Sequence, residues 1–352
     1  MERGGKGQHS LLVQMMLDRG KNKQARLSVG RGWEEGRLGI DTSSHRIDQP
    51  HRAASSIAMT SLRIAMLNAD TPVEAVRVKH PTYGHVFQHL LGLAATRIAP
   101  LTYIESEDFD VVQGQYPEFV DNFDAILITG SAASSYDDNE WNHKLDAWLA
   151  DVYQKHPSVK IFGSCFGHQM VCQSLLRPHG VYVEKAPNGW ELGVRKVTFT
   201  DQFRSAFAKR TAPRLTLPLG MRPPTPDADH DAKPVGCSVP EAVQIQLVHA
   251  DHVKIPSGAL PDSWMVIGSS AHCPVQGVYE PGRVLTYQGH FEFDRFINAE
   301  TVKVFGARWE PQMFQAALNA IDADDDAEVA AEMVLRFFLE GRGGDSGMVT
   351  PP

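Results

Sequence analysis

The chain has 352 residues, of which 42% are hydrophobic and 22% charged, a balance typical of a soluble globular protein with a full core. Its formal net charge of -8 argues against a nucleic-acid partner, and no apolar run reaches the roughly 18 to 20 residues of a membrane helix. The four cysteines show no C-x-x-C spacing, so reduced thiols and a cytoplasmic location are expected.

Residues 1–58 differ in composition from the rest of the chain. They contain ten Lys or Arg against six Asp or Glu, and a single aromatic residue, Trp33. A basic segment this poor in apolar residues cannot offset its ordering entropy by burial, so we predict a disordered N-terminal leader. Two alternatives stay open. One is an Arg-rich mitochondrial presequence, which the acidic residues argue against, and the other is a true start at Met59.

Strand-like and helix-like segments alternate from Leu62 to about residue 180. Short apolar runs that end in turn residues predict buried parallel strands at 62–69, 124–135 and 158–165. Apolar residues at helical spacing predict helices at 83–95 and 139–156. This order predicts an α/β fold with a doubly wound, mostly parallel sheet of the flavodoxin-like type.

After Gly180 the strand-like segments are separated by short turns. They predict an antiparallel flank on the same core, followed by helices at 311–321 and 327–341. The Pro- and Asp-rich stretch 218–238 is typical of a surface loop, and the Gly-rich end 342–352 is typical of a flexible tail. The predicted organisation is a leader (1–58), one α/β domain (59–341) and a tail (342–352).

The segment GSCFG places a cysteine between Gly163 and Gly167, where a predicted strand turns into a predicted helix. G-x-C-x-G is the cysteine version of the elbow that holds a nucleophile in a strained turn. The glycines let backbone pass close to the turn, so we expect the sulfur of Cys165 to stand exposed above the sheet. The N-terminus of the following helix favours negative charge and hence the thiolate. Cys165 is the predicted nucleophile, whereas a small buried hydrophobe is the preferred interpretation of Cys172, Cys237 and Cys273.

A cysteine nucleophile needs a base and a group that orients the base. In the segment QGHFE, His290 follows a predicted strand and a glycine, and Glu292 stands two residues later. This spacing puts both side chains on one side of an extended segment. His290 can accept the thiol proton, Glu292 can fix the imidazole tautomer, and the backbone N–H of Phe166 is placed to hold an oxyanion. Cys165, His290 and Glu292 form the predicted triad.

The segments GSCFGHQ and QGHFE, in this order, resemble the motifs of the class I glutamine amidotransferase domain, in the stand-alone subgroup similar to the GMP synthase glutaminase. The resemblance covers about residues 62–339. It implies that Cys165 attacks the γ-amide carbon of glutamine, that His290 protonates the leaving ammonia, and that water hydrolyses the thioester to glutamate. It also implies that Gln169 helps to hold the substrate. A second oxyanion N–H would come from the loop TGSAASS, at Gly130 or Ser131.

Two stretches differ from the usual pattern of the family or suggest another site. Phe291 stands between the histidine and the glutamate, where the family often has proline, and this change removes no reactive group. The segment HADHV places His249, Asp251 and His252 within four residues. So short a cluster is weak evidence for a metal site, and we expect packing roles and no metal.

The acceptor of the ammonia is not evident from the chain. Neither a Walker-type G-x-x-x-x-G-K-[ST] loop nor a Ser-Gly-Gly-x-Asp-Ser loop occurs, so no ATP site and no cofactor are expected. A separate synthetase or a biosynthetic pathway would receive the ammonia. Because γ-glutamyl peptidases resemble the same domain, hydrolysis of γ-glutamyl conjugates is the alternative function. A catalytically silent binding module is a second alternative, which the filled triad positions disfavour.

Overall fold

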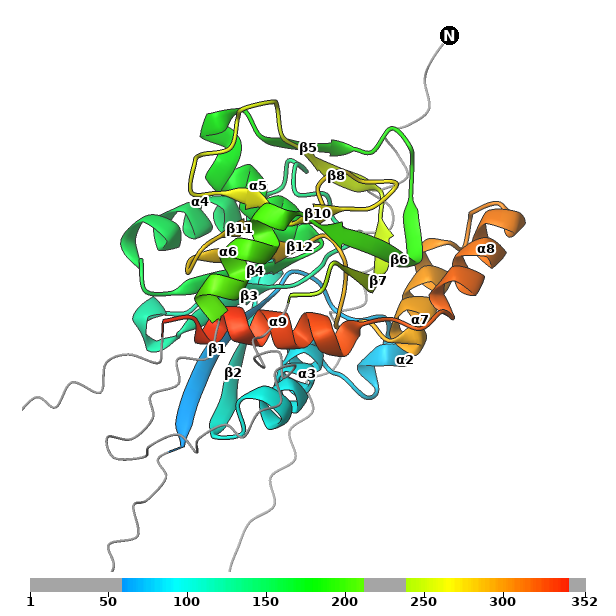
Figure 1. Ribbon diagram of the computed structural model, residues 1–352. Helices are drawn as coiled ribbons and strands as arrows, with labels where there is room; N and C mark the ends of the chain where they lie inside the picture. Colours follow the sequence, from blue (N-terminus) through cyan, green and yellow to red (C-terminus); the bar gives the residue numbers. More distant parts are fainter. Residues whose placement is uncertain (1–58, 212–238, 342–352) are drawn as a thin grey trace, which may run out of the picture. The chain divides into compact units, whose positions relative to one another are not determined.

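The computed structural model of the chain describes residues 59–211 and 239–341 (Figure 1). The predicted leader (1–58), the predicted loop (218–238) and the predicted tail (342–352) lie outside the described residues. The strands are β1 (Thr60–Asn68), β2 (Thr102–Asp110), β3 (Ala125–Ile128), β4 (Lys160–Ser164), β5 (Tyr182–Lys185), β6 (Glu191–Phe199), β7 (Ala242–His249), β8 (Asp251–Lys254), β9 (Met265–Val266), β10 (Gly268–Ser269), β11 (Val278–Glu280) and β12 (Val284–Tyr287). The α-helices are α2 (Glu74–Arg77), α3 (Tyr83–Ile98), α4 (Glu140–Lys155), α5 (Phe166–Leu176), α6 (Asp201–Thr211), α7 (Arg295–Phe305), α8 (Pro311–Ile321) and α9 (Ala327–Leu339).

In the two described ranges the strands form three sheets, of which the largest carries the predicted site. Its strand order is β2-β1-β3-β4-β12-β11-β9. The first five of these strands run parallel, and β11 runs antiparallel to both of its neighbours. Strands β10-β6-β7 and β5-β8 form two smaller antiparallel sheets. The predicted doubly wound, mostly parallel sheet with an antiparallel flank is confirmed.

Both faces of the central sheet are covered, and this explains the apolar runs in the sequence. Along β1, Leu62, Ile64 and Met66 pack in the layer that contains residues of α3 and α9. Ala65 and Leu67 pack in the opposite layer, with residues of α4 and α5. A strand that is buried on both faces has no solvent side, so its sequence is apolar throughout rather than alternating.

Strand β12 brings a late part of the chain next to the middle of the sheet. It pairs with β4 in a register that places Tyr287 opposite Ser164. Because the carboxyl ends of parallel strands meet at one edge of a sheet, the residues that follow β4 and β12 lie at the same edge. The backbone N–H of His290 also donates to the carbonyl of Gln246 in β7, at 2.8 Å, which ties this edge to the second sheet.

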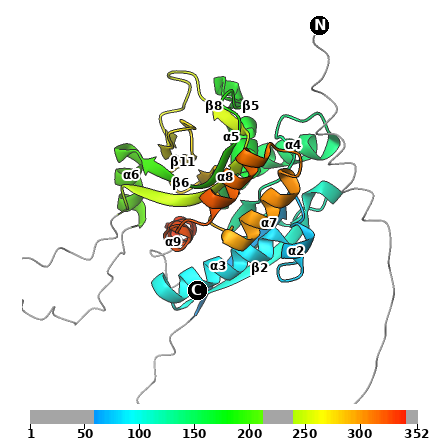
Figure 2. The same cartoon turned by 90° about the vertical axis from the view of Figure 1, so that its right-hand side faces the viewer.

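A third core cluster joins helices to the edge of the sheet where the predicted site lies. It contains Val76 of α2, Ile297 and Val302 of α7, and Ile321 of α8. Figure 2 shows α7 and α8 side by side. Helices α2, α6 and α7 and strand β2 are not among the predicted elements. No helix within residues 59–211 or 239–341 has the length and apolar character to span a bilayer.

Candidate active site

Cys165 occupies the turn between β4 and α5 with a strained backbone. Its φ of 52° makes it the one non-glycine residue with positive φ in the described part of the chain. The flanking glycines are needed for close approach, because a Cβ on Gly167 would lie 2.3 Å from the carbonyl oxygen of Ile128. A Cβ on Gly163 would lie 2.5 Å from the carbonyl carbon of Gly167. Such strain persists only where the surrounding structure enforces it, and it is typical of a nucleophile elbow.

The predicted open exposure of the sulfur is wrong. Cys165 is 6% exposed. It borders a cavity of about 350 Å³, counted with the open space at its mouth. The loop after β3 and the imidazole of His290 cover the elbow, since a Cβ built on Gly130 would lie 3.6 Å from Cβ of Cys165 and 3.0 Å from Cε1 of His290. The polar residues that line the cavity are Asp70, Tyr83, Ser131, Cys165, His290, Glu292 and Thr301.

His290 and Glu292 form a buried pair on the wall of this cavity. Nδ1 of His290 lies 2.7 Å from Oε1 of Glu292, and the two side chains are 3% and 1% exposed. The hydroxyl of Ser164 donates to the same carboxylate at 3.1 Å. The imidazole stacks on the ring of Phe293 at a centroid distance of 4.1 Å. These contacts fix the plane of the imidazole, and Nε2 is left buried without a hydrogen-bond partner among the described residues.

The pKa of His290 reflects two opposing effects. Burial lowers the pKa, because a charged imidazolium loses its hydration in the interior. The negative charges of Glu292 and Cys165 outweigh burial and raise the pKa of His290 to about 10. The site therefore favours an imidazolium at neutral pH, and the thiol of Cys165 is the adjacent group that can supply the proton.

The predicted oxyanion residues surround the elbow. Phe166 is the first residue of α5, a position at which the backbone N–H has no partner within the helix. Gly130 and Ser131 line the same cavity as Cys165. The aromatic ring of Phe166 packs against Trp141, at 5.3 Å between centroids, and Phe166 is not among the residues that line the cavity.

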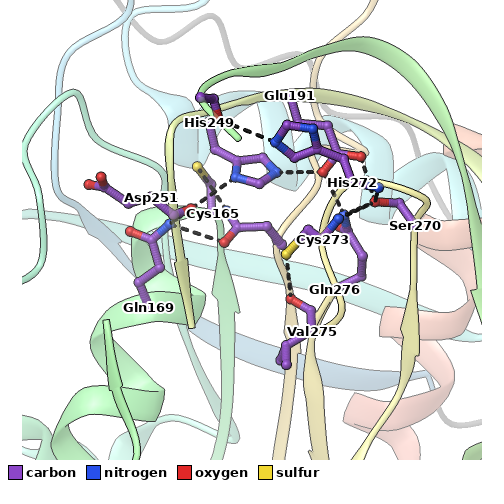
Figure 3. A network of polar contacts seen from close by, with 12 residues as sticks. Cys165, Gln169, Glu191, His249, Asp251, Ser270, His272, Cys273, Val275 and Gln276 are labelled. Carbon is purple, nitrogen blue, oxygen red and sulfur yellow. Dashed lines mark hydrogen bonds and ion pairs between the residues drawn. The ribbon is translucent and has the colours of Figure 1, made fainter. Parts of the chain in front are cut away.

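Gln169 lies beside the site but does not line the cavity. Its Nε2 donates to the backbone carbonyl of Asp251 at 3.1 Å and to Oε1 of Gln288 at 3.0 Å. Nε2 of Gln288 in turn donates to the sulfur of Cys165 at 3.6 Å. Figure 3 shows this network around Cys165, Gln169 and Asp251. The described structure thus connects Gln169 to the thiol through a second amide.

The cluster in HADHV is divided among separate polar contacts. Nε2 of His249 contacts Glu191 at 3.0 Å, and Nε2 of His252 contacts Glu184 at 3.2 Å. The carboxylate of Asp251 accepts hydrogen bonds from Ser134 and Tyr136. No group of three or more metal-ligating side chains occurs in the described ranges.

Several polar residues of the site, among them Asp70, Tyr83 and Gln288, are not among the sequence predictions. Asp70 and Tyr83 line the cavity from the segments after β1 and at the start of α3, and Gln288 contacts the thiol from the end of β12. The position of Asp70 after an apolar strand was an available signal, because polar residues at the carboxyl ends of parallel strands gather at one edge. Gln288 carried a signal too, because it stands two residues before His290.

Known proteins resemble the chain in sequence over most of its length, although no protein-family model matches it. It is 28% identical over 284 residues to a glutamine amidotransferase-like protein of Schizosaccharomyces pombe, covering 79% of this chain and 98% of the relative. It is 25% identical over 291 residues to γ-glutamyl peptidase 3 of Arabidopsis thaliana, covering 79% and 97%.

A solved structure shares the fold. The glutamine amidotransferase from Methylobacillus flagellatus superposes with a TM-score of 0.50 at 17% identity, covering 80% of this chain and 92% of that one. At this identity the likeness concerns the fold. Together with the sequence relatives, it confirms the predicted resemblance to the class I glutamine amidotransferase-like domain.

Proposed function

We propose that the protein hydrolyses the γ-amide of glutamine through a thioester on Cys165 and releases ammonia. The observation that carries the proposal is the meeting of a strained cysteine elbow and a buried His290–Glu292 pair at one cavity. Neither half is specific alone, because a buried cysteine or a strand-end histidine is common. A thiol beside an imidazole that a carboxylate orients is the arrangement that cysteine hydrolases need.

The proposed reaction begins with transfer of the proton of Cys165 Sγ to His290 Nε2. The thiolate attacks the γ-carbonyl carbon, and the oxyanion receives hydrogen bonds from the backbone N–H groups of Phe166 and of Gly130 or Ser131. His290 returns the proton to the leaving nitrogen, the C–N bond breaks, and ammonia departs. Water then gives a proton to His290 and attacks the thioester carbon. The C–S bond breaks, glutamate leaves, and His290 returns the proton to the sulfur to restore the thiol.

The ammonia would serve a separate acceptor. The amide nitrogen would pass to a synthetase or a biosynthetic pathway, because the sequence carries no recognised ATP-binding loop of its own. The glutamine-binding role proposed for Gln169 would act beside the cavity rather than from its wall.

A second substrate class is favoured by a specific observation. Several relatives are named γ-glutamyl peptidases, and the chain covers 97% of one of them. The same steps would cleave a γ-glutamyl peptide, with an α-amino group as the leaving nitrogen in place of ammonia.

The test measures glutamate release from glutamine and from γ-glutamyl dipeptides by the wild type, Cys165→Ala and Cys172→Ala. Cys172 is a matched control, since its thiol lies on the same helix, is fully buried and has a raised pKa because of that burial. We expect release to vanish in Cys165→Ala and to persist in Cys172→Ala. Trapping with a glutamine analogue, followed by mass spectrometry, should locate one adduct on Cys165.

The outcomes separate the readings. Release that survives Cys165→Ala refutes the assigned nucleophile. Cleavage of γ-glutamyl dipeptides without cleavage of glutamine selects the peptidase. A folded protein that is inactive toward both and forms no adduct selects the silent binding module.

A further inference from the structure

We infer that Gln288 is a hydrogen-bond donor to the thiolate of Cys165, and that Gln169 locks the Gln288 amide in the donating orientation. This inference rests on the proposed function, because it assigns roles around the proposed nucleophile. It gives Gln169 a second role, as a positioning residue that acts through Gln288. Figure 3 labels Cys165, Gln169 and Asp251, which take part in these contacts.

The orientation of both amides follows from one acceptor. The backbone carbonyl of Asp251 can only accept, so the atom of Gln169 that lies 3.1 Å from it must be the NH₂ group. The same NH₂ group lies 3.0 Å from the Gln288 amide, which must therefore present its oxygen to Gln169. The NH₂ group of Gln288 is left to face the sulfur at 3.6 Å. Reversing either amide would place two donors or two acceptors against each other.

The backbone carbonyl of Asp251 is in turn held by a buried pair of side chains, His249 and Glu191. Nδ1 of His249 lies 2.9 Å from the carbonyl oxygen of Asp251, and Nε2 lies 3.0 Å from the carboxylate of Glu191. Both partners are acceptors, so each ring nitrogen of His249 is placed to donate a hydrogen bond. The carboxylate of Glu191 also accepts from Ser270 and Gln276.

The charge state of Glu191 agrees with this ion pair. Burial raises its pKa, but the hydrogen bond and charge of His249 and the hydrogen bond from Ser270 more than offset burial and leave the pKa lowered. His249 and Glu191 are 3% and 2% exposed, so the pair is shielded from salt and water. The donor to the thiolate thus stands at the end of a network that a buried ion pair holds in place.

Burial determines how strongly the amide of Gln288 stabilises the thiolate of Cys165. Gln288 is fully buried, and Cys165 and Gln169 are nearly so. A hydrogen bond to an ionised group is stronger than one between neutral groups, and more so in a low dielectric. Removing the donor would leave the thiolate with the imidazolium as its one strong partner at this edge.

Other titratable groups around Cys165 come from several elements. His290 and Glu292 follow β12, and Asp70 and Tyr83 line the same cavity as Cys165. On its own helix, His168 is neutral, because burial lowers its pKa to about 3. The effect of Gln288 on the pH of half-maximal alkylation of Cys165 must therefore be measured in variants that leave these groups in place.

The experiment follows alkylation of Cys165 by iodoacetamide as a function of pH, with the modified peptide quantified by mass spectrometry. The variants are Gln288→Met, which removes the donor, and Gln169→Glu, which puts an acceptor in place of the donor that orients Gln288. Gln173→Glu is the matched control, since Gln173 stands one turn further along α5 and bonds to Ser135 instead. The plateau rate at high pH reports whether the folded site still admits the reagent.

We expect Gln288→Met and Gln169→Glu to raise the pH of half-maximal alkylation by about one unit, the size expected for loss of a hydrogen bond to a charged group. Gln173→Glu should leave it unchanged. An unmoved midpoint in Gln288→Met, with Cys165 still labelled selectively, overturns the inference and leaves the proposed function standing. A shift in Gln288→Met alone overturns the role of Gln169. If wild-type Cys165 is labelled no faster than Cys172 and Cys273, the proposed function itself fails.

Discussion

The buried carboxylate of Glu292 determines the protonation of His290. Without it, burial would act on the imidazole with less opposition and lower its pKa. In Glu292→Gln we expect the alkaline limb of the pH profile of kcat/KM to move to lower pH, together with a loss of kcat of about 10²-fold or more, the range of general acid–base catalysis. Steady-state assays between pH 6 and pH 10 would check this. A lower kcat with an unmoved alkaline limb would contradict it.

The same pair couples stability to pH. The pKa of His290 is raised from 6.5 to about 10 in the folded state, so its contribution to the free energy of unfolding is fully present below about pH 6.5. That contribution is lost as pH rises through about 10. We expect the difference in unfolding free energy between the wild type and Glu292→Gln to be larger at pH 6 than at pH 10. Urea denaturation of both proteins at the two pH values measures it. Equal differences at both would contradict the linkage.

At the scale of elements, the elbow depends on the absence of a side chain at Gly167. An added methyl group would meet the carbonyl oxygen of Ile128 at 2.3 Å, so backbone must shift. We expect Gly167→Ala to lower the free energy of unfolding by about 1–3 kcal/mol, the usual cost of overpacking, and to reduce activity. Gly92→Ala in α3 is the control, because nothing lies within 4 Å of the added Cβ. It should be neutral or stabilise the helix by up to about 1 kcal/mol. Urea unfolding compares the two, and an equal effect would rule out the close contact as the cause.

The sequence predicted the strands with continuous apolar runs and the helices with a regular apolar spacing, and it missed elements that lack such a pattern. The apolar runs and helical spacings gave β1, β3, β4, α3, α4, α8 and α9 to within a few residues, except that the run at 124–135 forms a strand only at its start. Strand β2 was not predicted because Ile104 is its one buried residue, and the rest of TYIESEDFD is polar or partly exposed. Helix α7 was not predicted because it directly follows the segment QGHFEFD, with Asp294 as its N-cap residue. The local hydrophobic pattern does not predict so abrupt a change from an extended segment to a helix.

The predicted triad residues meet in space, but their surroundings could not be predicted from the sequence. Cys165, His290 and Glu292 were found from short motifs, in which spacing alone implies geometry. Asp70 and Gln288 reach the site through the register of β1, β4 and β12, which no single segment specifies. The burial of the sulfur also depends on a loop from another strand.

At the scale of the whole described domain, a buried polar cluster fastens the end of α9 to the central sheet. The hydroxyl of Tyr279 donates to the carboxylate of Glu340 at 2.7 Å, and Nζ of Lys160 donates to its backbone carbonyl at 2.6 Å. The guanidinium of Arg210 lies 3.6 Å from the same carboxylate, but its side chain is 51% exposed. The cluster thus combines an interior contact with a surface one.

This difference in exposure predicts two unequal substitutions. We expect Glu340→Leu to lower the free energy of unfolding by about 1–3 kcal/mol, because the buried hydroxyl of Tyr279 loses its partner. Arg210→Ala should cost less than about 1 kcal/mol, since an exposed ion pair is screened by water. Chemical denaturation of each variant at pH 7 tests the ranking. The reverse order would show that the surface contact is the stronger one.

The pairing of β4 with β12 also has a consequence during synthesis. The ribosome completes the cysteine turn and its helix long before it makes the strand that carries the imidazole. In the nascent chain, the thiol of Cys165 therefore exists before His290, its proposed proton acceptor, has been made. The proposed amide cleavage would become available only when this late strand pairs with the earlier one, so the nascent chain would stay inactive until its central sheet is complete.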